Sequence, residues 1–322
     1  MTIRARATLL TISGVVTCAC CATPACASER DLLVSSRFSN SVIRYDGLTG
    51  ALIGTFASGP ELRNPNGMAF GPDGNLYVGL GDDGAVLRYH GRTGVFMDTF
   101  VQAGSGGLAS VRDIAFGPDG NLYANSGTTN QVLRFSGDTG AFQGIAAQGG
   151  GLTGPVGLTF GPDGSLYVGG ALSNRIYKFS PEGTLLRTYN PGGLSNVTGV
   201  TFGFDGMLYA SMSVSNAIAR FNPESGALAG SFGGGSGLSI PIYSTISPTG
   251  DLIVGSFGND SVRRFNTASG SYEGVFVAPG LGGLNGTHDL VYMPIPAPEP
   301  LGLAALALMS GVRRRARCQP SV

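Results

Sequence analysis

A repeat of about 44 residues constrains the fold of this chain more than any other sequence feature. Residues 70–77 (FGPDGNLY) recur at 116–123 and 160–167, and weaker copies lie at 202–209 and 246–253, so that successive copies begin 46, 44, 42 and 44 residues apart. A second signature, which ends in a basic residue followed by Tyr or Phe, occurs six times. Six copies of one unit at this period predict a single repeat architecture over most of the chain.

Each copy of the repeat predicts four short strands. In the second copy these are residues 67–70, 75–79, 85–89 and 95–101, which are rich in β-branched and aromatic residues. The Pro-Asp-Gly segment at 72–74 predicts a turn, because proline presets φ, aspartate bonds to the local main chain and glycine accepts a positive φ. No segment of the repeat region has a sustained apolar period of 3.6 residues, so no helix of note is expected. Four antiparallel strands per unit are typical of a β-propeller blade.

The two ends of the repeat region indicate how the blades join. Residues 31–35 match the second strand of a copy, and the missing first strand is found at 289–292, which matches 67–70. We therefore expect the last strand to complete the first blade, which removes the open sheet edge that a linear array exposes. The predicted fold is all-β: a six-bladed β-propeller with four antiparallel strands per blade, closed into a ring by the C-terminal strand.

The positive charge of the chain is concentrated at its ends. The formal net charge is zero, from 20 basic and 20 acidic residues. Six of the basic residues are Arg4, Arg6, Arg313, Arg314, Arg315 and Arg317. Without these and Glu299, the body keeps 14 basic against 19 acidic residues, a net charge near −5. Nucleic acids and anionic membranes bind basic surfaces, so we expect neither as a partner of the body.

The cysteines are also confined to the ends. Four of them precede residue 27, and the fifth is Cys318. The segment between them has no cysteine, which excludes a disulfide framework and a thiolate metal site from the body.

Residues 1–27 have the pattern of a secretory signal peptide. Arg4 and Arg6 form a basic start, residues 7–22 are apolar or small, and Ala25-Cys26-Ala27 supplies a small-residue cleavage site. A buried or membrane-spanning first helix and a lipoprotein modified at Cys18 are the alternatives. The pattern predicts export, with a mature body that spans residues 28–293.

Residues 294–322 have the pattern of a second targeting signal. A proline-rich spacer that contains Pro298, Glu299 and Pro300 precedes an apolar run at 301–312, which is followed by arginines including Arg313, Arg314 and Arg315. This order resembles the PEP-CTERM sorting signal of Gram-negative bacteria. The resemblance implies processing by an exosortase-type enzyme, transient membrane association through the tail, and release to the cell-envelope surface or the outside. The run of 12 residues is shorter than the roughly 20 that span a bilayer, and a simple amphipathic tail is the alternative.

The repeat itself resembles NHL-type propellers and, more loosely, the streptogramin-lyase and gluconolactonase-like propellers. The resemblance covers residues 31–292 and rests on the repeated FGPDGNLY-like segments and basic-aromatic strand ends. Propellers of this kind occur among enzymes and binding proteins alike, so the resemblance implies an architecture more than a function.

The mouth of the central channel is where we expect binding residues. The residues that lead into the predicted inner strands surround this mouth, and several of them are polar. The candidate ligand-binding set is Asn66, Arg112, Asp113, Asn196, Tyr243, His288 and Asp289. No catalytic residue is assigned, because a polar channel lining bonded to water and main chain explains the same residues.

Two chemical roles remain open for this mouth. His288 is a candidate general base, with Arg112 placed to steady developing negative charge. Oxygen ligands from Asn64, Asn66, Asp113, Asn196 and Asp289 suit a divalent cation such as calcium. The acidic segment 81–84 is a further candidate for a surface calcium, or simply a polar turn.

Two sets of repeated residues are interpreted as structural. The basic residue of each copy is predicted to form a repeated interblade ion pair or to pack its stem; these residues are Arg44, Arg88, Arg134, Lys178, Arg220 and Arg264. Residues two places before the third strand are predicted to form turns; these are Asn40, Gly84, Asn130, Asn174, Asn216 and Asp260.

The leading functional hypothesis is a non-enzymatic, exported propeller that binds a glycan, a peptide or an envelope protein through its channel face. The PEP-CTERM resemblance favours an exopolysaccharide setting. The rival is a hydrolase or lyase of lactone-like substrates that uses His288 or a divalent metal. A purely structural role in the extracellular matrix is the third hypothesis.

Overall fold

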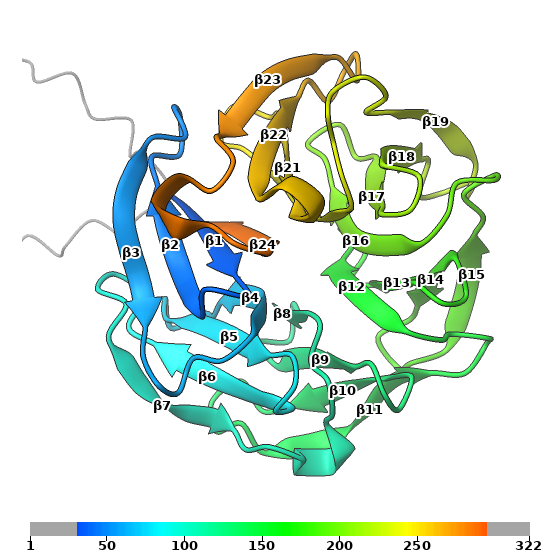
Figure 1. The fold of residues 1–322 in the computed structure, drawn as a ribbon. Helices are drawn as coiled ribbons and strands as arrows, with labels where there is room; N and C mark the ends of the chain where they lie inside the picture. Colours follow the sequence, from blue (N-terminus) through cyan, green and yellow to red (C-terminus); the bar gives the residue numbers. More distant parts are fainter. Residues whose placement is uncertain (1–30, 295–322) are drawn as a thin grey trace, which may run out of the picture.

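The computed structural model describes residues 31–294 and arranges them as six four-stranded antiparallel sheets around a central axis (Figure 1). Blade 1 consists of β24 (Thr287–Tyr292), β1 (Leu32–Ser36), β2 (Ser41–Tyr45) and β3 (Leu52–Ser58). Blade 2 consists of β4 (Pro65–Phe70), β5 (Leu76–Leu80), β6 (Ala85–Tyr89) and β7 (Phe96–Val101). Blade 3 consists of β8 (Ile114–Phe116), β9 (Leu122–Ser126), β10 (Gln131–Phe135) and β11 (Phe142–Gln148).

The remaining blades repeat this order. Blade 4 consists of β12 (Pro155–Phe160), β13 (Leu166–Gly170), β14 (Arg175–Phe179) and β15 (Leu185–Tyr189). Blade 5 consists of β16 (Val197–Phe202), β17 (Leu208–Met212), β18 (Ala217–Phe221) and β19 (Leu228–Phe232). Blade 6 consists of β20 (Pro241–Ile246), β21 (Leu252–Ser256), β22 (Ser261–Phe265) and β23 (Tyr272–Val277). Three short 3-10 turns complete the described chain: η1 (Ser105–Gly107), η2 (Phe257–Asn259) and η3 (Leu281–Gly283).

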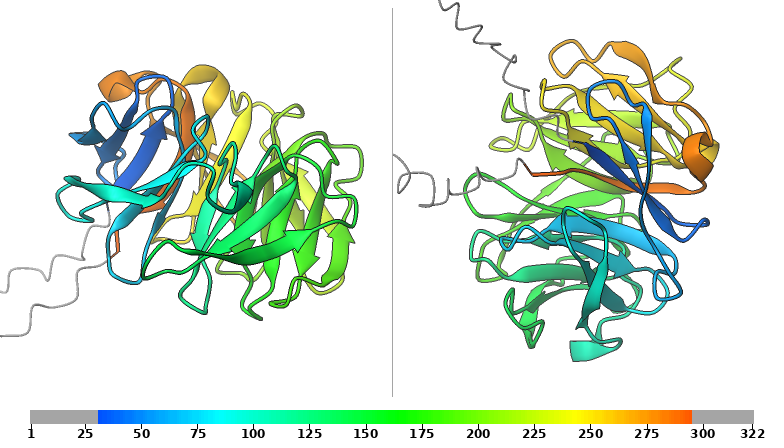
Figure 2. Two further views of the ribbon diagram at one scale, coloured as in Figure 1. Left: turned by 90° about the horizontal axis from the view of Figure 1, so that it is seen from below. Right: turned by 90° about the vertical axis from the view of Figure 1, so that its left-hand side faces the viewer.

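The predicted six-bladed ring and its closure are confirmed. The last strand, β24, pairs antiparallel with β1, with Leu32 opposite Tyr292. The main-chain N of Met293 donates to the carbonyl of Asp31 at 2.9 Å, so the two ends of the described chain lie side by side. Figure 2 shows these ends on the face opposite η2 and η3. The predicted signal peptide, and the predicted tail from residue 295 on, lie outside the described residues.

The aromatic residues of the repeat form the core between blades. The Tyr77 ring packs edge-on against Phe116 of the next blade, with ring centroids 4.9 Å apart. Tyr123 and Phe160 repeat this contact at 4.9 Å. Such pairs contribute roughly 0.5–1.5 kcal/mol beyond their buried area. Neighbouring blades are therefore joined by the same residues that define the repeat. Within residues 31–294, no helix is long and apolar enough to cross a membrane.

The repeated basic residues form their ion pairs within a blade, which corrects the predicted interblade pairing. Lys178 Nζ lies 2.8 Å from Asp163 of blade 4, and Arg264 Nη2 lies 2.6 Å from Asp251 of blade 6. The cause is the strand register, because the basic residue on the third strand faces the turn that precedes the second strand of its own sheet. Between blades, Arg220 donates to main-chain carbonyls, those of Thr267 and Ala268.

The predicted turn formers adopt positive φ and also join the blades. Asn174 has φ of 51°, and its Oδ1 accepts a hydrogen bond from the main-chain N of Asn196 at 2.8 Å. Asn130 and Asn216 accept equivalent bonds from the loops that enter the next blades. Asparagine tolerates this left-handed conformation better than other non-glycine residues. These residues thus fix the loops that lead to the channel.

Five innermost strands are longer than the second copy predicted. For example, β4 begins at Pro65 rather than at residue 67, and its pairing with β5 shifts between Pro65 and Met68. The same irregularity occurs in β12, β16, β20 and β24. A bulge of this kind re-aims side chains and is frequent beside functional sites.

Candidate site at the channel mouth

Three side chains occupy the position at which the six innermost strands come closest. At this position blades 2, 4 and 5 carry glycine, whereas the other blades carry Asp113, Tyr243 and Asp289. A Cβ added to Gly67 would lie 2.4 Å from the Cα of Asp113, and one added to Gly157 would lie 2.6 Å from the Cα of Gly199. The strands therefore approach main chain to main chain, and only the three larger side chains fill the channel here.

The two aspartates join neighbouring blades. Asp289 accepts hydrogen bonds from the main-chain N of Met68 in blade 2 at 2.6 Å and of Leu290 at 2.7 Å. Asp113 is bonded in the same way, to the residue that follows it at 2.9 Å and to Leu158 in blade 4 at 2.8 Å. Each carboxylate oxygen thus has a main-chain donor, which gives both groups a structural role.

Burial makes the same two carboxyl groups unusually basic. Burial, followed by repulsion from Asp289, raises the pKa of Asp113 well above its usual value. Burial raises the pKa of Asp289 to about 7, against the opposing effect of its main-chain hydrogen bonds. Two interacting buried carboxyls are therefore able to hold a proton near neutral pH.

Tyr243 crosses the channel and closes it at this level. Its ring is 3% exposed, and its hydroxyl lies 2.9 Å from both the Arg112 carbonyl of blade 3 and the Val156 carbonyl of blade 4. Burial, with the nearby aspartates, raises the pKa of Tyr243, so the hydroxyl stays protonated and donates. A side chain of blade 6 is thereby fixed to the opposite side of the ring.

His288 lies against Tyr243 and is almost fully buried. The ring centroids of these residues are 5.1 Å apart, and Phe257 covers another edge of the imidazole at 6.4 Å. Its Nδ1 is buried and has no hydrogen-bond partner among the described residues. Burial, then the charges of Arg37 and Arg112, hold the pKa of His288 well below its usual value. The imidazole is therefore neutral at physiological pH.

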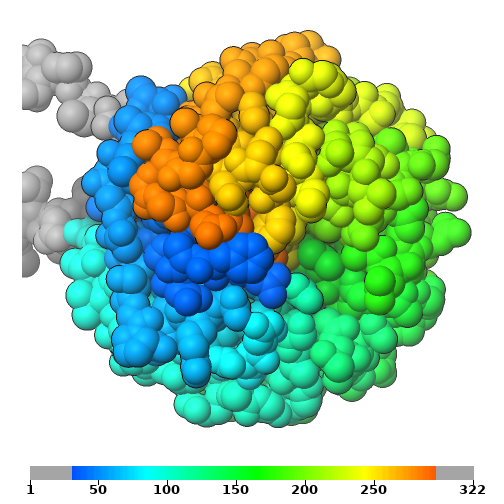
Figure 3. Space-filling view, viewed as in Figure 1, coloured from blue at the N-terminus to red at the C-terminus, as the bar shows by residue number. Residues whose placement is uncertain are grey.

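The outer surface of the mouth is aromatic and basic. Phe38 is 55% exposed, and its ring packs edge-on against Phe257 at 5.6 Å. Arg37 lies over the Phe38 ring at 5.9 Å and 3.6 Å from Asp82. Burial, then the positive charge of Arg112, lowers the pKa of Arg37. The two guanidinium groups are therefore near enough to repel each other. Figure 3 shows this face, with the start of blade 1 (deep blue) beside the closing segment near η3 (orange).

The predicted site residues do not all meet. Arg112, Asp113, Tyr243, His288 and Asp289 lie together at or below the mouth. Asn66 is beside this group, but its buried amide donates to the Val111 carbonyl instead of facing the channel. Asn196 is on the loop that Asn174 fixes.

Arg37, Phe38 and Phe257 were missed by the sequence prediction. They lie in the loops that follow the second strands, whereas the prediction considered only the loops that enter the first strands. A signal was present: the residue directly after the second strand is small in four copies but large in the first and sixth. These six residues are Arg37, Gly81, Gly127, Ala171, Ser213 and Phe257.

The predicted oxygen ligands for a divalent cation do not all face the channel. In residues 31–294, no three His, Cys, Asp or Glu side chains form a group suited to a metal ion. The Asn64 amide donates to Asp82 rather than facing the channel. In the acidic turn, Asp83 lies 3.4 Å from Arg63. A cation at the mouth thus stays a prediction that titration has to test.

Comparisons with known proteins agree on the fold. The sequence matches no protein-family model and no curated protein. Virginiamycin B lyase from Staphylococcus aureus has a similar structure, with 20% identity, a TM-score of 0.53, and coverage of 73% of this chain and 71% of that one. A chain of the nidogen/laminin complex is 17% identical, with a TM-score of 0.69 and coverage of 83% and 99%. The WD40 propeller domain of Doa1 is 14% identical, with a TM-score of 0.59 and coverage of 79% and 81%.

Similarity at these sequence identities shows a shared fold and does not show a shared chemical activity. The chain is a six-bladed β-propeller whose architecture is shared by a lyase and by propellers of other kinds.

Proposed function

We propose that the chain is an exported binding propeller, displayed at the cell envelope or released outside, whose channel mouth binds an acidic glycan. Exposed aromatic faces such as that of Phe38 offer a surface on which sugar rings pack. The guanidinium groups of Arg37 and Arg112 are suited to carboxylates, which they bind by paired hydrogen bonds. A local basic mouth on an otherwise acidic body also gives such a ligand a preferred place to bind.

The observation that carries the proposal is the closure of the channel by Tyr243. Its hydroxyl is held by two main-chain carbonyls, and every oxygen of Asp113 and Asp289 has a main-chain donor. The polar groups most suited to catalysis are therefore engaged in holding the ring together. What remains accessible is the outer surface with Phe38 and Arg37, which suits binding.

The position of the chain ends supports display. The two ends of the described chain are hydrogen-bonded to each other, and Figure 2 shows them on the face opposite η2 and η3. A chain that is held or released through its C-terminal tail would thus keep the mouth directed outwards.

Binding of a polyuronate and of neutral dextran to the purified chain tests this function. We expect the polyuronate to bind and dextran to bind at least tenfold more weakly, since only the former offers carboxylates to Arg37. Phe38→Ser is expected to weaken binding at least tenfold. The matched control is Phe204→Ser, because Phe204 is 75% exposed in a turn on the opposite face. Equal effects of the two substitutions, or equal binding of both polymers, would overturn the proposal.

A lyase acting on lactone-like substrates is the second candidate. The observation that favours it is the neutral, buried His288 beside Tyr243, in a fold shared with a streptogramin lyase. Calorimetric titration with calcium and magnesium after chelator treatment, repeated on His288→Ala and Asp113→Asn, examines the cation that such an enzyme implies. Micromolar binding lost in Asp113→Asn, together with lactone opening lost in His288→Ala, would favour the lyase. Flat traces and intact lactones would favour the binding propeller.

A further inference from the structure

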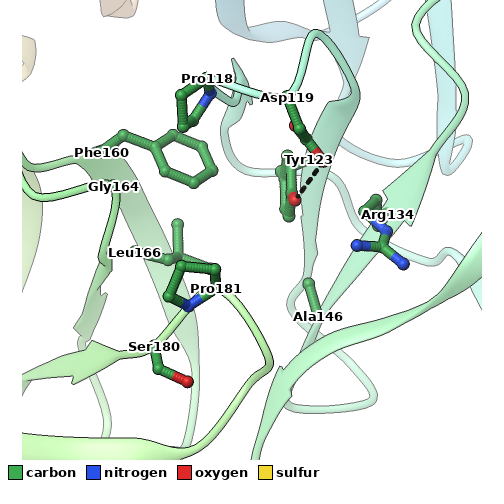
Figure 4. A pocket seen from close by; sticks show the side chains of 10 residues that line it. All are labelled: Pro118, Asp119, Tyr123, Arg134, Ala146, Phe160, Gly164, Leu166, Ser180 and Pro181. Atoms are coloured by element: carbon green, nitrogen blue, oxygen red, sulfur yellow. Dashed lines mark hydrogen bonds between the residues drawn. The ribbon is translucent and has the colours of Figure 1, made fainter.

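A pocket lies between blades 3 and 4 on the face opposite the channel mouth. Its volume is about 110 Å³, and Figure 4 shows the side chains around it. We call it the interblade pocket. The residues that line it are Pro118, Asp119, Tyr123, Arg134, Ala146, Phe160, Gly164, Leu166, Ser180 and Pro181. Prolines, aromatic rings and aliphatic side chains thus form most of its wall, and the Arg134 guanidinium lies at one side (Figure 4).

Arg134 differs from its counterparts in the other blades. Four of those form ion pairs with a carboxylate of their own blade: Arg44, Arg88, Lys178 and Arg264. The fifth, Arg220, donates to the Thr267 carbonyl at 3.3 Å. Arg134 and Arg220 both have a buried Nε without a hydrogen-bond partner among the described residues. Of these two, Arg134 is the one beside the pocket, where it also interacts with the Tyr123 hydroxyl.

The fourth strand offers Arg134 no carboxylate. Arg88 faces Asp98 across its sheet, whereas Arg134 faces Gly144. Arg44 and Arg264 also face a glycine, but they pair with Asp31 and Asp251 of their own blades. The acidic residue on the wall, Asp119, accepts bonds from the Asn121 amide at 2.7 Å and from the Tyr123 hydroxyl at 3.0 Å. Against the opposing effect of burial, these bonds, and to a smaller extent the charge of Arg134, lower the pKa of Asp119.

We propose that the interblade pocket is a second binding site, which takes a small ring-shaped or apolar group that carries a carboxylate. The carboxylate of the ligand forms with Arg134 the kind of ion pair that four other blades form within themselves. The apolar part of the ligand packs between Pro118, Phe160 and Pro181. Such a site is independent of the channel mouth, because it lies on the opposite face and uses blades 3 and 4 alone.

Benzoate and its neutral analogue benzamide are the probes for this site. Titration of the purified chain, followed by ligand-observed NMR, is expected to give saturable benzoate binding with a dissociation constant on the order of 1 mM for a ligand of this size. Benzamide, which has no charge, is expected to bind at least tenfold more weakly. Arg134→Gln is expected to weaken benzoate binding at least tenfold. The matched control Arg88→Gln removes the same charge at the equivalent position of blade 2 and is expected to leave benzoate binding unchanged.

A second variant keeps the test decisive if Arg134→Gln does not fold. Ala146→Leu adds bulk to the pocket wall and keeps Arg134, so it is expected to reduce benzoate binding while far-UV circular dichroism stays that of the parent. Benzoate binding that does not saturate, that equals benzamide binding, or that survives both pocket substitutions would overturn the proposal.

Discussion

Replacing Asn174 by alanine removes one of the side chains that hold a blade to the next loop. Two hydrogen bonds are lost, one from the Asn196 main-chain N at 2.8 Å and one to the Leu194 carbonyl at 2.9 Å. Each contributes about 1 kcal/mol. Alanine at φ of 51° adds about 1 kcal/mol of strain, because only glycine and asparagine-like residues adopt this conformation readily. The expected loss in the free energy of unfolding is therefore about 3 kcal/mol.

Asn216→Ala is the internal control for this value. Asn216 has φ of 49° and makes one such bond, to the Ile240 main-chain N at 2.7 Å, so its replacement is expected to cost about 2 kcal/mol. Urea unfolding followed by tyrosine fluorescence and circular dichroism measures both, with the slope of the transition as a check on two-state behaviour. A loss below about 1 kcal/mol for Asn174→Ala, or equal losses for both variants, would refute the hydrogen-bond argument.

Three further predictions concern the channel. Resistance to urea is expected to fall as the pH rises from about 4 through 7, because burial raises the pKa of Asp113 and raises that of Asp289 to about 7. The two carboxyls outweigh His288, whose lowered pKa acts in the opposite direction, and a higher urea midpoint at pH 8 than at pH 5 would contradict this. Gly67→Ala is expected to lower the free energy of unfolding by about 1–3 kcal/mol, since the added Cβ would lie 2.4 Å from the Cα of Asp113. In the same urea assay, Gly234→Ala is expected to cost little, because no atom lies within 4 Å of its added Cβ. Tyr243→Phe is expected to cost about 1–2 kcal/mol, because the Arg112 carbonyl loses this donor, whereas the Val156 carbonyl keeps the Asn125 amide. An unchanged thermal midpoint would argue against the crossing hydrogen bonds.

The fold was predictable because the residues that determine the turns and the contacts between blades recur at fixed positions in the repeat. The Pro-Asp-Gly turns and the aromatic residues of each copy determine both the hairpins and the contacts between blades, such as that of Tyr77 with Phe116. The closing strand was predictable from the position of the chain ends within the repeat. The first copy lacks its first strand, and residues 289–292 supply it. By contrast, the inner-strand bulge has no mark in the apolar pattern, which is why β4 begins two residues earlier than expected.

The site was predicted only in part, for a physical reason. Residue position along the repeat identified Asp113, Tyr243 and Asp289, which do occupy the channel. Position alone does not reveal how far a side chain extends. Tyr243 packs over Gly199 of blade 5 and spans the ring, whereas the Asn66 amide bonds to a main-chain carbonyl. Arg37 comes from a different loop and approaches the mouth only in three dimensions.

The departures from the repeat are distributed unevenly around the ring. Blades 2, 4 and 5 carry glycine at the closest approach of the inner strands, whereas blades 1, 3 and 6 carry Asp289, Asp113 and Tyr243. The glycines are what allow each aspartate to reach a main-chain N–H of the next blade. The large residues at the outer mouth, Arg37 and Phe257, also come from blades 1 and 6. One sector of the propeller therefore supplies most of the distinctive chemistry, and a ligand of the mouth is expected to contact blades 1 and 6 before any other.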